Sequence, residues 1–234
     1  MKTLKKLLII IIFISFIFIG YYTYQGYNMY KQAINKTPLE KRIEKIKEDK
    51  NYIKIEQLPE IYINSVIAVE DHRFYEHGAI DIISIGRAIY TDIKEMKLVE
   101  GGSTITQQLA KNIYFTQEKK LVRKIAEIFM AFEIEENCNK DEILELYVNT
   151  CYFGDGYYNI KEASNGYFDK EPRELNEYEA TLLAGLPNAP SVYAPTKNPE
   201  LARQRQTQVV EKLVKYKYIT QEQADNILNV EYKF

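Results

Sequence analysis

The sequence predicts a mainly α-helical domain that follows one membrane-spanning helix. Three observations predict it: an apolar run at the amino terminus, apolar residues at helical spacing across residues 60–228, and no alternating run long enough to require a sheet. With 234 residues, the chain can hold one sizeable domain and a minor lobe. The elements are taken in chain order below.

The amino-terminal segment has the composition of a membrane anchor. Lys2, Lys5 and Lys6 precede an apolar run at residues 7–20, and several tyrosines follow it as an interfacial belt. No small-residue cleavage site follows, so an uncleaved anchor is favoured over a signal peptide. The lysines place the amino terminus in the cytoplasm and the rest of the chain outside. We expect an anchor at 1–24, a juxtamembrane stalk at 25–55 and the main domain at 56–234.

The helices of the main domain are separated by glycines and prolines. The first begins after Pro59, the third begins at Ser103 after two glycines, and the fourth has one apolar face. The second is richer in isoleucine than one buried face needs; core packing accounts for most of this, and a surface that dips into the membrane is the alternative. The expected helices are 60–76, 81–96, 103–114, 119–136, 140–150, 158–167, 176–185, 198–216 and 220–228.

Composition excludes some classes of function. The net charge is −2 with 27% charged residues, so no global field favours nucleic acid. Cys138 and Cys151 form neither a disulfide framework nor a metal-ligand pattern, and two free thiols are expected.

An acidic pair, Glu70 and Asp71, directly follows the apolar residues 66–69. Such a carboxylate is partly desolvated, which makes it a usable proton acceptor. Phe74 and His77 lie four and seven residues after Glu70, a spacing that predicts one helical face. For an isolated pair, a helix-end salt bridge is the more common explanation.

The segment 101–112 is a glycine turn that leads into a polar helix. Thr104, Gln108 and Lys111 are spaced to form one stripe, and Ser103 is the expected N-cap. A helix start of this kind exposes backbone N–H groups that can hold an anion. An ordinary capped helix is the alternative.

A third cluster begins with basic residues. Arg123 and Glu127 are four residues apart, which by default is a surface ion pair. The helix also carries apolar residues on one side, so it is expected to be embedded there. A local excess of cations beside Lys111 suits a pyrophosphate; these cations are Lys119, Lys120, Arg123 and Lys124.

Taken together, the motifs resemble those of the peptidoglycan glycosyltransferases, the family 51 transglycosylases of class A penicillin-binding proteins and of monofunctional enzymes. The match covers about residues 56–225. It comprises E-D-x-x-F-x-x-H at 70–77, G-G-S-T-I-T-Q-Q-L-x-K-N at 101–112, R-K-x-x-E at 123–127, K-x-E-I-L-E-x-Y-x-N-x-x-Y-F-G at 140–154, and E-A-x-L-L-A-G-L-P at 179–187, followed by Tyr193-x-Pro195.

The resemblance implies a lysozyme-like α fold with a small membrane-proximal jaw lobe. The implied reaction polymerises lipid II into β-1,4-linked glycan with inversion and releases undecaprenyl pyrophosphate. By the matching positions, Glu70 is the general base and Glu127 assists at the donor. The implied substrate-binding residues are Asp71, Phe74, His77, Ser103, Thr104, Gln108, Lys111, Asn112, Arg123 and Lys124. Of these, Asp71, Phe74 and His77 are expected to shape the site.

The resemblance also sets the expected partners: lipid II, the growing glycan strand, the bacterial membrane and cell-wall assembly proteins, but no nucleic acid. No cofactor is required, although a divalent cation, Mg²⁺ or Mn²⁺, is compatible with the pyrophosphate. No S-x-x-K motif occurs in the sequence, so a monofunctional enzyme is expected. Asn159 and Asp169 stand where the family has glycine, and both types tolerate left-handed backbone.

Two other functions fit part of the pattern. A lysozyme-like hydrolase also uses a pair of carboxylates, but it has no pyrophosphate to hold, so the basic helix argues against it. A non-catalytic, membrane-tethered scaffold for wall assembly would need no base at Glu70.

Overall fold

The structure is a computed structural model that describes residues 2–95, 101–115 and 121–231. These residues form helices joined by short loops, with no strand among them, which confirms the mainly α fold class. The α-helices are α1 (Lys2–Lys36), α2 (Leu39–Lys47), α3 (Glu60–Glu70), α4 (Ile82–Glu95), α5 (Ile105–Tyr114), α6 (Leu121–Asn137), α7 (Lys140–Val148), α8 (Ile160–Phe168), α9 (Glu177–Gly185), α10 (Pro190–Tyr193), α11 (Pro199–Lys215) and α12 (Gln221–Leu228). Four single-turn 3₁₀ helices join them: η1 (Ile55–Gln57), η2 (Phe74–Glu76), η3 (Pro172–Glu174) and η4 (Leu186–Asn188).

The expected helix at 60–76 is the clearest departure from the sequence prediction. α3 ends at Glu70 because Asp71 takes a φ of −160°, outside the helical region, and a separate turn, η2, follows. The prediction that Glu70, Phe74 and His77 share one helical face is therefore wrong. Glu70 is therefore the last residue of α3.

The two positions where the family has glycine behave differently from each other. Asp169 is the left-handed C-cap of α8, with φ 54°, as its residue type allows. Asn159 is instead an extended N-cap with φ −154°, and its side chain accepts a hydrogen bond from the Glu162 N–H. Left-handed tolerance therefore explains Asp169, whereas Asn159 is explained by capping.

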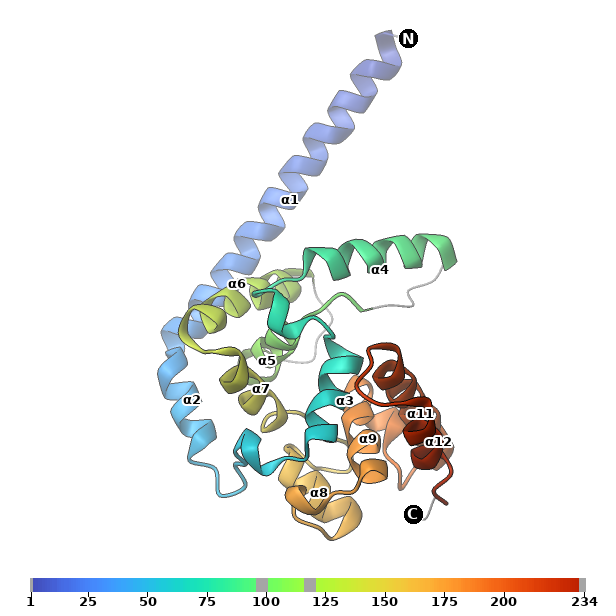
Figure 1. Ribbon diagram of the computed structural model, residues 1–234. Helices are drawn as coiled ribbons and strands as arrows, with labels where there is room; N and C mark the ends of the chain where they lie inside the picture. The colour runs from blue at the N-terminus through green and yellow to red at the C-terminus, as the bar shows by residue number, and fades with distance from the viewer. Residues whose placement is uncertain (1, 96–100, 116–120, 232–234) are drawn as a thin grey trace.

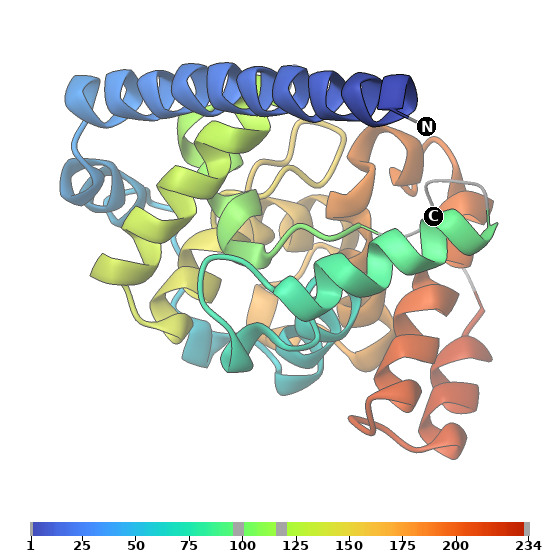
Figure 2. The same ribbon diagram turned by 90° about the horizontal axis from the view of Figure 1, so that it is seen from above.

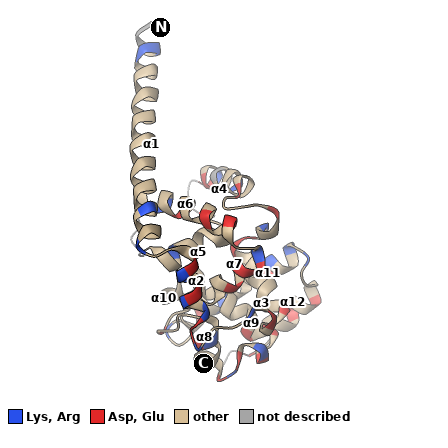
Figure 3. Ribbon diagram, turned by 90° about the vertical axis from the view of Figure 1, so that its left-hand side faces the viewer, with Lys and Arg blue, Asp and Glu red and all other residues tan. Residues whose placement is uncertain are grey.

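Helix α1 is long and apolar enough to cross a membrane: residues 4–36 have a mean hydropathy of 2.3 in the most apolar window, and none of that window is buried. Figure 3 shows how few charged residues it carries along most of its length. The segment 25–55, expected to be a stalk, packs onto the domain and contributes Tyr30, Leu39 and Ile53 to its hydrophobic core.

The lower part of α1 packs closely against α6. Tyr27 and Tyr30 lie against Phe129, and the Tyr30 hydroxyl donates to Glu133 at 2.5 Å. At Gly26 the two helices approach so closely that a Cβ atom would lie 2.5 Å from the Ile125 Cγ2 atom. The glycine is thus required by close approach.

Replacing Gly26 with valine is expected to lower the stability of the solubilised protein. The added atoms must separate α1 from α6, and overpacking of this kind costs about 1–3 kcal/mol. Thermal unfolding in detergent should show a melting temperature lower by a few degrees, roughly 2–4 °C per kcal/mol at this size. Gly20→Val is the matched control, because nothing lies within 4 Å of the Cβ position at Gly20. An equal change in both variants would contradict the close-contact explanation.

The domain is organised as two groups of helices around one core. In the first, α5 packs against α6 and α7; in the second, α3 packs against α9 and α11. Helix α4 lies on the side from which α1 projects (Figures 1 and 2), and Ile82, Ile83 and Ile93 on it are exposed. Its contact with a membrane stays a prediction.

Candidate active site

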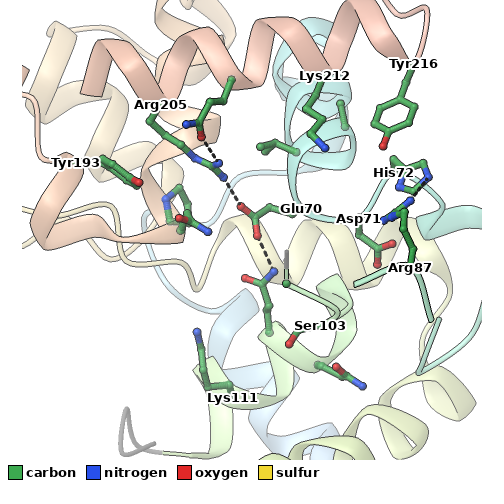
Figure 4. Close-up of a pocket in the computed structure, with 18 of the residues that line it drawn as sticks. Glu70, Asp71, His72, Arg87, Ser103, Lys111, Tyr193, Arg205, Lys212 and Tyr216 are labelled. Atoms are coloured by element: carbon green, nitrogen blue, oxygen red, sulfur yellow. Dashed lines mark hydrogen bonds and ion pairs between the residues drawn. The ribbon is translucent and has the colours of Figure 1, made fainter. Parts of the chain in front are cut away.

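A cleft of about 790 Å³ opens between the two groups of helices. The segment 101–103, α5 and α6 line it on one side, η4, α10 and α11 line it on the other, and the end of α3 lies between them. Figure 4 shows Glu70 near its centre, with Lys111 and Ser103 on one wall and Arg205 and Lys212 on the other. The residues expected from the sequence and found in the lining are Glu70, Asp71, Ser103, Gln108, Lys111, Arg123, Lys124 and Glu127.

The Glu70 carboxylate is held by a donor from each wall. Gln108 Nε2 donates to Oε2 at 2.7 Å, and Arg205 Nη2 lies 3.3 Å from Oε1. The Glu70 side chain is only 7% exposed. Two donors fix the direction of this carboxylate. It can therefore accept a proton from a hydroxyl group placed in the cleft.

Asp71 ties the end of α3 to the start of α5. Its Oδ1 bonds to His77 Nε2 at 2.7 Å, and its Oδ2 accepts from the Ile105 N–H at 3.1 Å. Phe74 is fully buried in the core. Phe74 and His77 are not part of the described lining of the cleft. Phe74 and His77 therefore support the end of α3, which carries Glu70, and do not face the cleft.

The two histidines of the chain have opposite pKa shifts. Burial alone would lower the pKa of His77, but the hydrogen bond and charge of Asp71 outweigh it and raise that pKa above 6.5. For His72, burial and the neighbouring Arg87 lower the pKa below 6.5, despite nearby carboxylates.

These shifts predict a stability maximum near neutral pH. A raised pKa in the folded state gives stability that is lost as pH rises through it, and a lowered pKa gives stability that is lost as pH falls through it. Melting temperatures across pH 5 to 9 should therefore fall less on the alkaline side in His77→Gln, and less on the acid side in His72→Gln. The reverse assignment would contradict the Asp71–His77 pair.

The N-cap of α5 differs from the prediction. Thr104, not Ser103, accepts from the Gln107 N–H, at 3.1 Å, and its own hydroxyl donates to the Ala79 carbonyl. Thr104 is 2% exposed and does not share a stripe with Gln108 and Lys111. Ser103 instead accepts a hydrogen bond from Lys124 Nζ at 2.6 Å inside the cleft. Because Thr104 caps the helix, the Ser103 side chain is not needed as a cap and can face the cleft.

The Arg123–Glu127 pair is largely buried, which agrees with the expected embedding of this helix and not with the surface ion pair that the spacing gives by default. Arg123 Nη1 lies 2.6 Å and Lys124 Nζ 3.2 Å from the two oxygens of Glu127, which is 2% exposed. Burial lowers the pKa of Lys124, although Glu127 acts in the opposite direction. With Lys111 nearby, three cations face one cleft region. Lys119 and Lys120 lie outside the described residues.

Asn112 does not line the cleft; its Nδ2 donates to Cys151 Sγ at 3.8 Å on the core side of α5. Both cysteines are free, as predicted, and both are buried.

Several cleft residues were missed by the sequence analysis. Arg205, Lys212 and Tyr216 come from α11 and its end, a segment read only as a helix. The Tyr216 ring stacks on His72 with centroids 4.3 Å apart, and Arg87 Nη1 lies 3.3 Å from His72 Nε2. The spacing of 205, 212 and 216 is that of one helical face, and this was the available signal.

The Asp71, His77 and Asp81 ligand atoms lie within 4.8 Å of one another. Arg73 Nε donates to the Asp81 carboxylate at 3.0 Å, and the Ser84 hydroxyl donates to it at 2.5 Å. The Asp81 carboxylate is therefore already occupied by protein donors. We therefore assign no metal to this cluster.

Comparisons with known proteins show the family to which the chain belongs. The sequence model of the family described as Transglycosylase matches residues 36–214. Penicillin-binding protein 1F of Bacillus subtilis is 40% identical over 224 residues, 94% of this chain and 31% of its own length. Penicillin-binding protein 1A of Neisseria lactamica is 44% identical over 78% of this chain and 23% of its own length. Penicillin-binding protein 1A of Aquifex aeolicus is 44% identical over 76% of this chain and 24% of its own length.

The chain thus spans about a quarter to a third of the length of these curated relatives. Among solved structures, penicillin-binding protein 1A from Haemophilus influenzae aligns with a TM-score of 0.48 and 22% identity, over 78% of this chain and 18% of that one.

Proposed function

Because the chain belongs to the transglycosylase family, we propose that it is a peptidoglycan glycosyltransferase that polymerises lipid II. The observation that carries the proposal is a carboxylate and a group of cations in the same cleft: Glu70 near its centre, and Lys111, Arg123 and Lys124 on the wall that α5 and α6 form. A base and charge neutralisation are what transfer from a pyrophosphate-activated sugar requires.

In the proposed reaction, Glu70 accepts the proton of the acceptor 4-hydroxyl. The hydroxyl oxygen attacks C1 of the donor sugar from the face opposite the leaving group, which gives inversion. The bond between C1 and the pyrophosphate oxygen breaks, and undecaprenyl pyrophosphate leaves with the electron pair. Lys111, Arg123 and Lys124 neutralise its charge, and Glu127 holds the last two in place.

Ser103 and Gln108 would contact the sugar–phosphate portion of the substrate from the α5 wall. A divalent cation, Mg²⁺ or Mn²⁺, would bind the pyrophosphate of the substrate, and we assign no protein residue as its ligand. The anchor α1 fits a lipid-borne donor. We propose a single-pass bacterial membrane protein with its amino terminus in the cytoplasm, residues 1–24 as anchor and 56–234 as the catalytic domain outside. Cell-wall assembly proteins are the expected protein partners.

The hydrolase alternative is disfavoured by the two cations that pair with Glu127 and by Lys111 in the same cleft, which a glycan hydrolase has no reason to place there. The scaffold alternative leaves the two-donor fixation of Glu70 unexplained.

The test is incubation of the detergent-solubilised protein with labelled lipid II, followed by separation of products by length. Polymer that a muramidase digests supports the transferase. Loss of preformed glycan without any polymer from lipid II would indicate the hydrolase. Unchanged lipid II, with and without Mg²⁺ or Mn²⁺, would leave the scaffold as the better reading.

A further inference from the structure

A line of polar side chains runs from Glu70 into the core, away from the cleft. Its first member is Gln108, which uses both ends of its carboxamide. Nε2 donates to Glu70 at 2.7 Å, and Oε1 accepts from the Tyr147 hydroxyl at 3.2 Å. Tyr147 lies on α7 and is 1% exposed.

The line continues behind Tyr147. Tyr147 and Cys151 are hydrogen-bonded to each other, and Asn112 Nδ2 donates to Cys151 Sγ at 3.8 Å. Burial raises the pKa of the Cys151 thiol to about 12, so the thiol keeps its proton. From Tyr147 outward, each hydrogen bond has its donor on the core side, and the series ends on the Glu70 carboxylate.

The direction of the series matters because a glutamine amide can be turned by 180°. One orientation places the amide NH₂ against Glu70, and the other places the amide oxygen there. A carboxylate can only accept hydrogen bonds, so the second orientation sets two acceptors against each other. A hydroxyl that donates to Oε1 favours the first orientation, and Tyr147 supplies that hydroxyl.

We propose that Tyr147 is a positioning residue for Glu70: its hydroxyl fixes the Gln108 carboxamide so that a donor faces the carboxylate, with Cys151 and Asn112 supporting Tyr147 from behind. Neither Tyr147, Cys151 nor Asn112 belongs to the described lining of the cleft. The proposal rests on the proposed function, in which Glu70 takes the proton of the acceptor. It moves Asn112 from substrate binding to this support.

Losing the orientation of Gln108 has a defined consequence for the carboxylate. Arg205 remains as the other described partner of Glu70, on the opposite wall. Glu70 is then drawn toward Arg205 and away from α5, where the acceptor hydroxyl must meet the donor sugar. Because Lys111, Arg123 and Lys124, which bind the pyrophosphate in the proposed function, are unchanged, the loss falls mainly on kcat and much less on KM.

The test is a double-mutant cycle of Tyr147→Phe and Gln108→Ala, measured as kcat and KM for lipid II. Tyr147→Phe alone is expected to lower kcat about 10-fold, the equivalent of one lost hydrogen bond, with KM within about twofold. In the Gln108→Ala background, Tyr147→Phe is expected to change nothing further, because it acts through Gln108. Cys151→Ala should give a smaller loss that the same background also removes.

Tyr62→Phe is the matched control. Tyr62 on α3 is also 1% exposed, and neither described contact of Glu70 involves it. This variant should keep the kcat of the wild type in both backgrounds. Equal fractional losses from Tyr147→Phe in the two backgrounds, or no loss in either, would overturn the proposal.

A second measurement separates this proposal from the proposed function. The side-chain NH₂ signals of Gln108, assigned by their absence in Gln108→Ala, are followed by NMR in the solubilised protein. We expect them to shift or broaden in Tyr147→Phe and to stay in place in Tyr62→Phe. Unchanged signals in Tyr147→Phe would overturn the orientation, whereas absence of polymer with the wild type would overturn only the transferase.

Discussion

Glu70→Gln is expected to reduce lipid II polymerisation by about 10³-fold, within the range of 10² to 10⁴ that a general base contributes. The substitution keeps the size and shape of the side chain but removes its ability to accept a proton. Lys111, Arg123 and Lys124 are untouched, so KM for lipid II should change little while kcat falls. Initial rates of polymer formation across a range of lipid II concentrations measure both.

Glu200→Gln is the control for this variant, because Glu200 is an exposed carboxylate at the start of α11, the helix that carries Arg205. It should retain the wild-type rate. Polymer formed by Glu70→Gln at a rate near that of the wild type would remove the base from the mechanism.

The helices were largely predictable from the sequence because apolar periodicity and glycine–proline punctuation are local signals. Most predicted bounds lie within one or two residues of those observed. The error at 60–76 has a physical cause. The Asp71 carboxylate accepts a hydrogen bond from the Ile105 N–H at the start of α5, 34 residues later in the chain. This contact holds Asp71 outside the helix, so α3 ends at Glu70. A long-range bond of this kind leaves no local pattern.

The site was predictable where its residues fall in compact motifs, as at 70–77, 101–112 and 123–127. The opposite wall was not, because Arg205 meets Glu70 only after α11 packs on α3 and α9. Spacing alone also left the burial of one ion pair open. Arg123 and Glu127 have the spacing of a surface pair, and only the packing of α6 between α1 and α5 shows that their helix is covered on two sides.

Glu127→Gln is expected to have the second largest effect, a loss of about 10²-fold in kcat. Glu127 fixes Arg123 and Lys124 at 2.6 and 3.2 Å, so neutralising it releases both from the place where the leaving pyrophosphate is held. Electrostatic stabilisation depends on such charges being fixed before the reaction. The released cations also lose their competing carboxylate, so they should bind the donor pyrophosphate more tightly. We therefore expect KM to fall together with kcat.

Stability should also fall, because Glu127 is a buried partner of two cations. Breaking a fully buried pair costs about 3–5 kcal/mol, and the 39% exposure of the Lys124 side chain reduces that cost here.

Glu135→Gln separates the loss of stability from the loss of activity. Glu135 lies on the same helix, pairs with Lys140 at 2.8 Å and accepts from the Thr106 hydroxyl, but it lies outside the described lining of the cleft. Both variants should melt at lower temperature, and only Glu127→Gln should lose kcat. An increase in KM at unchanged kcat in Glu127→Gln would instead mean that Glu127 binds the substrate directly. Equal kcat losses in the two variants would reduce its role to holding α6 in place.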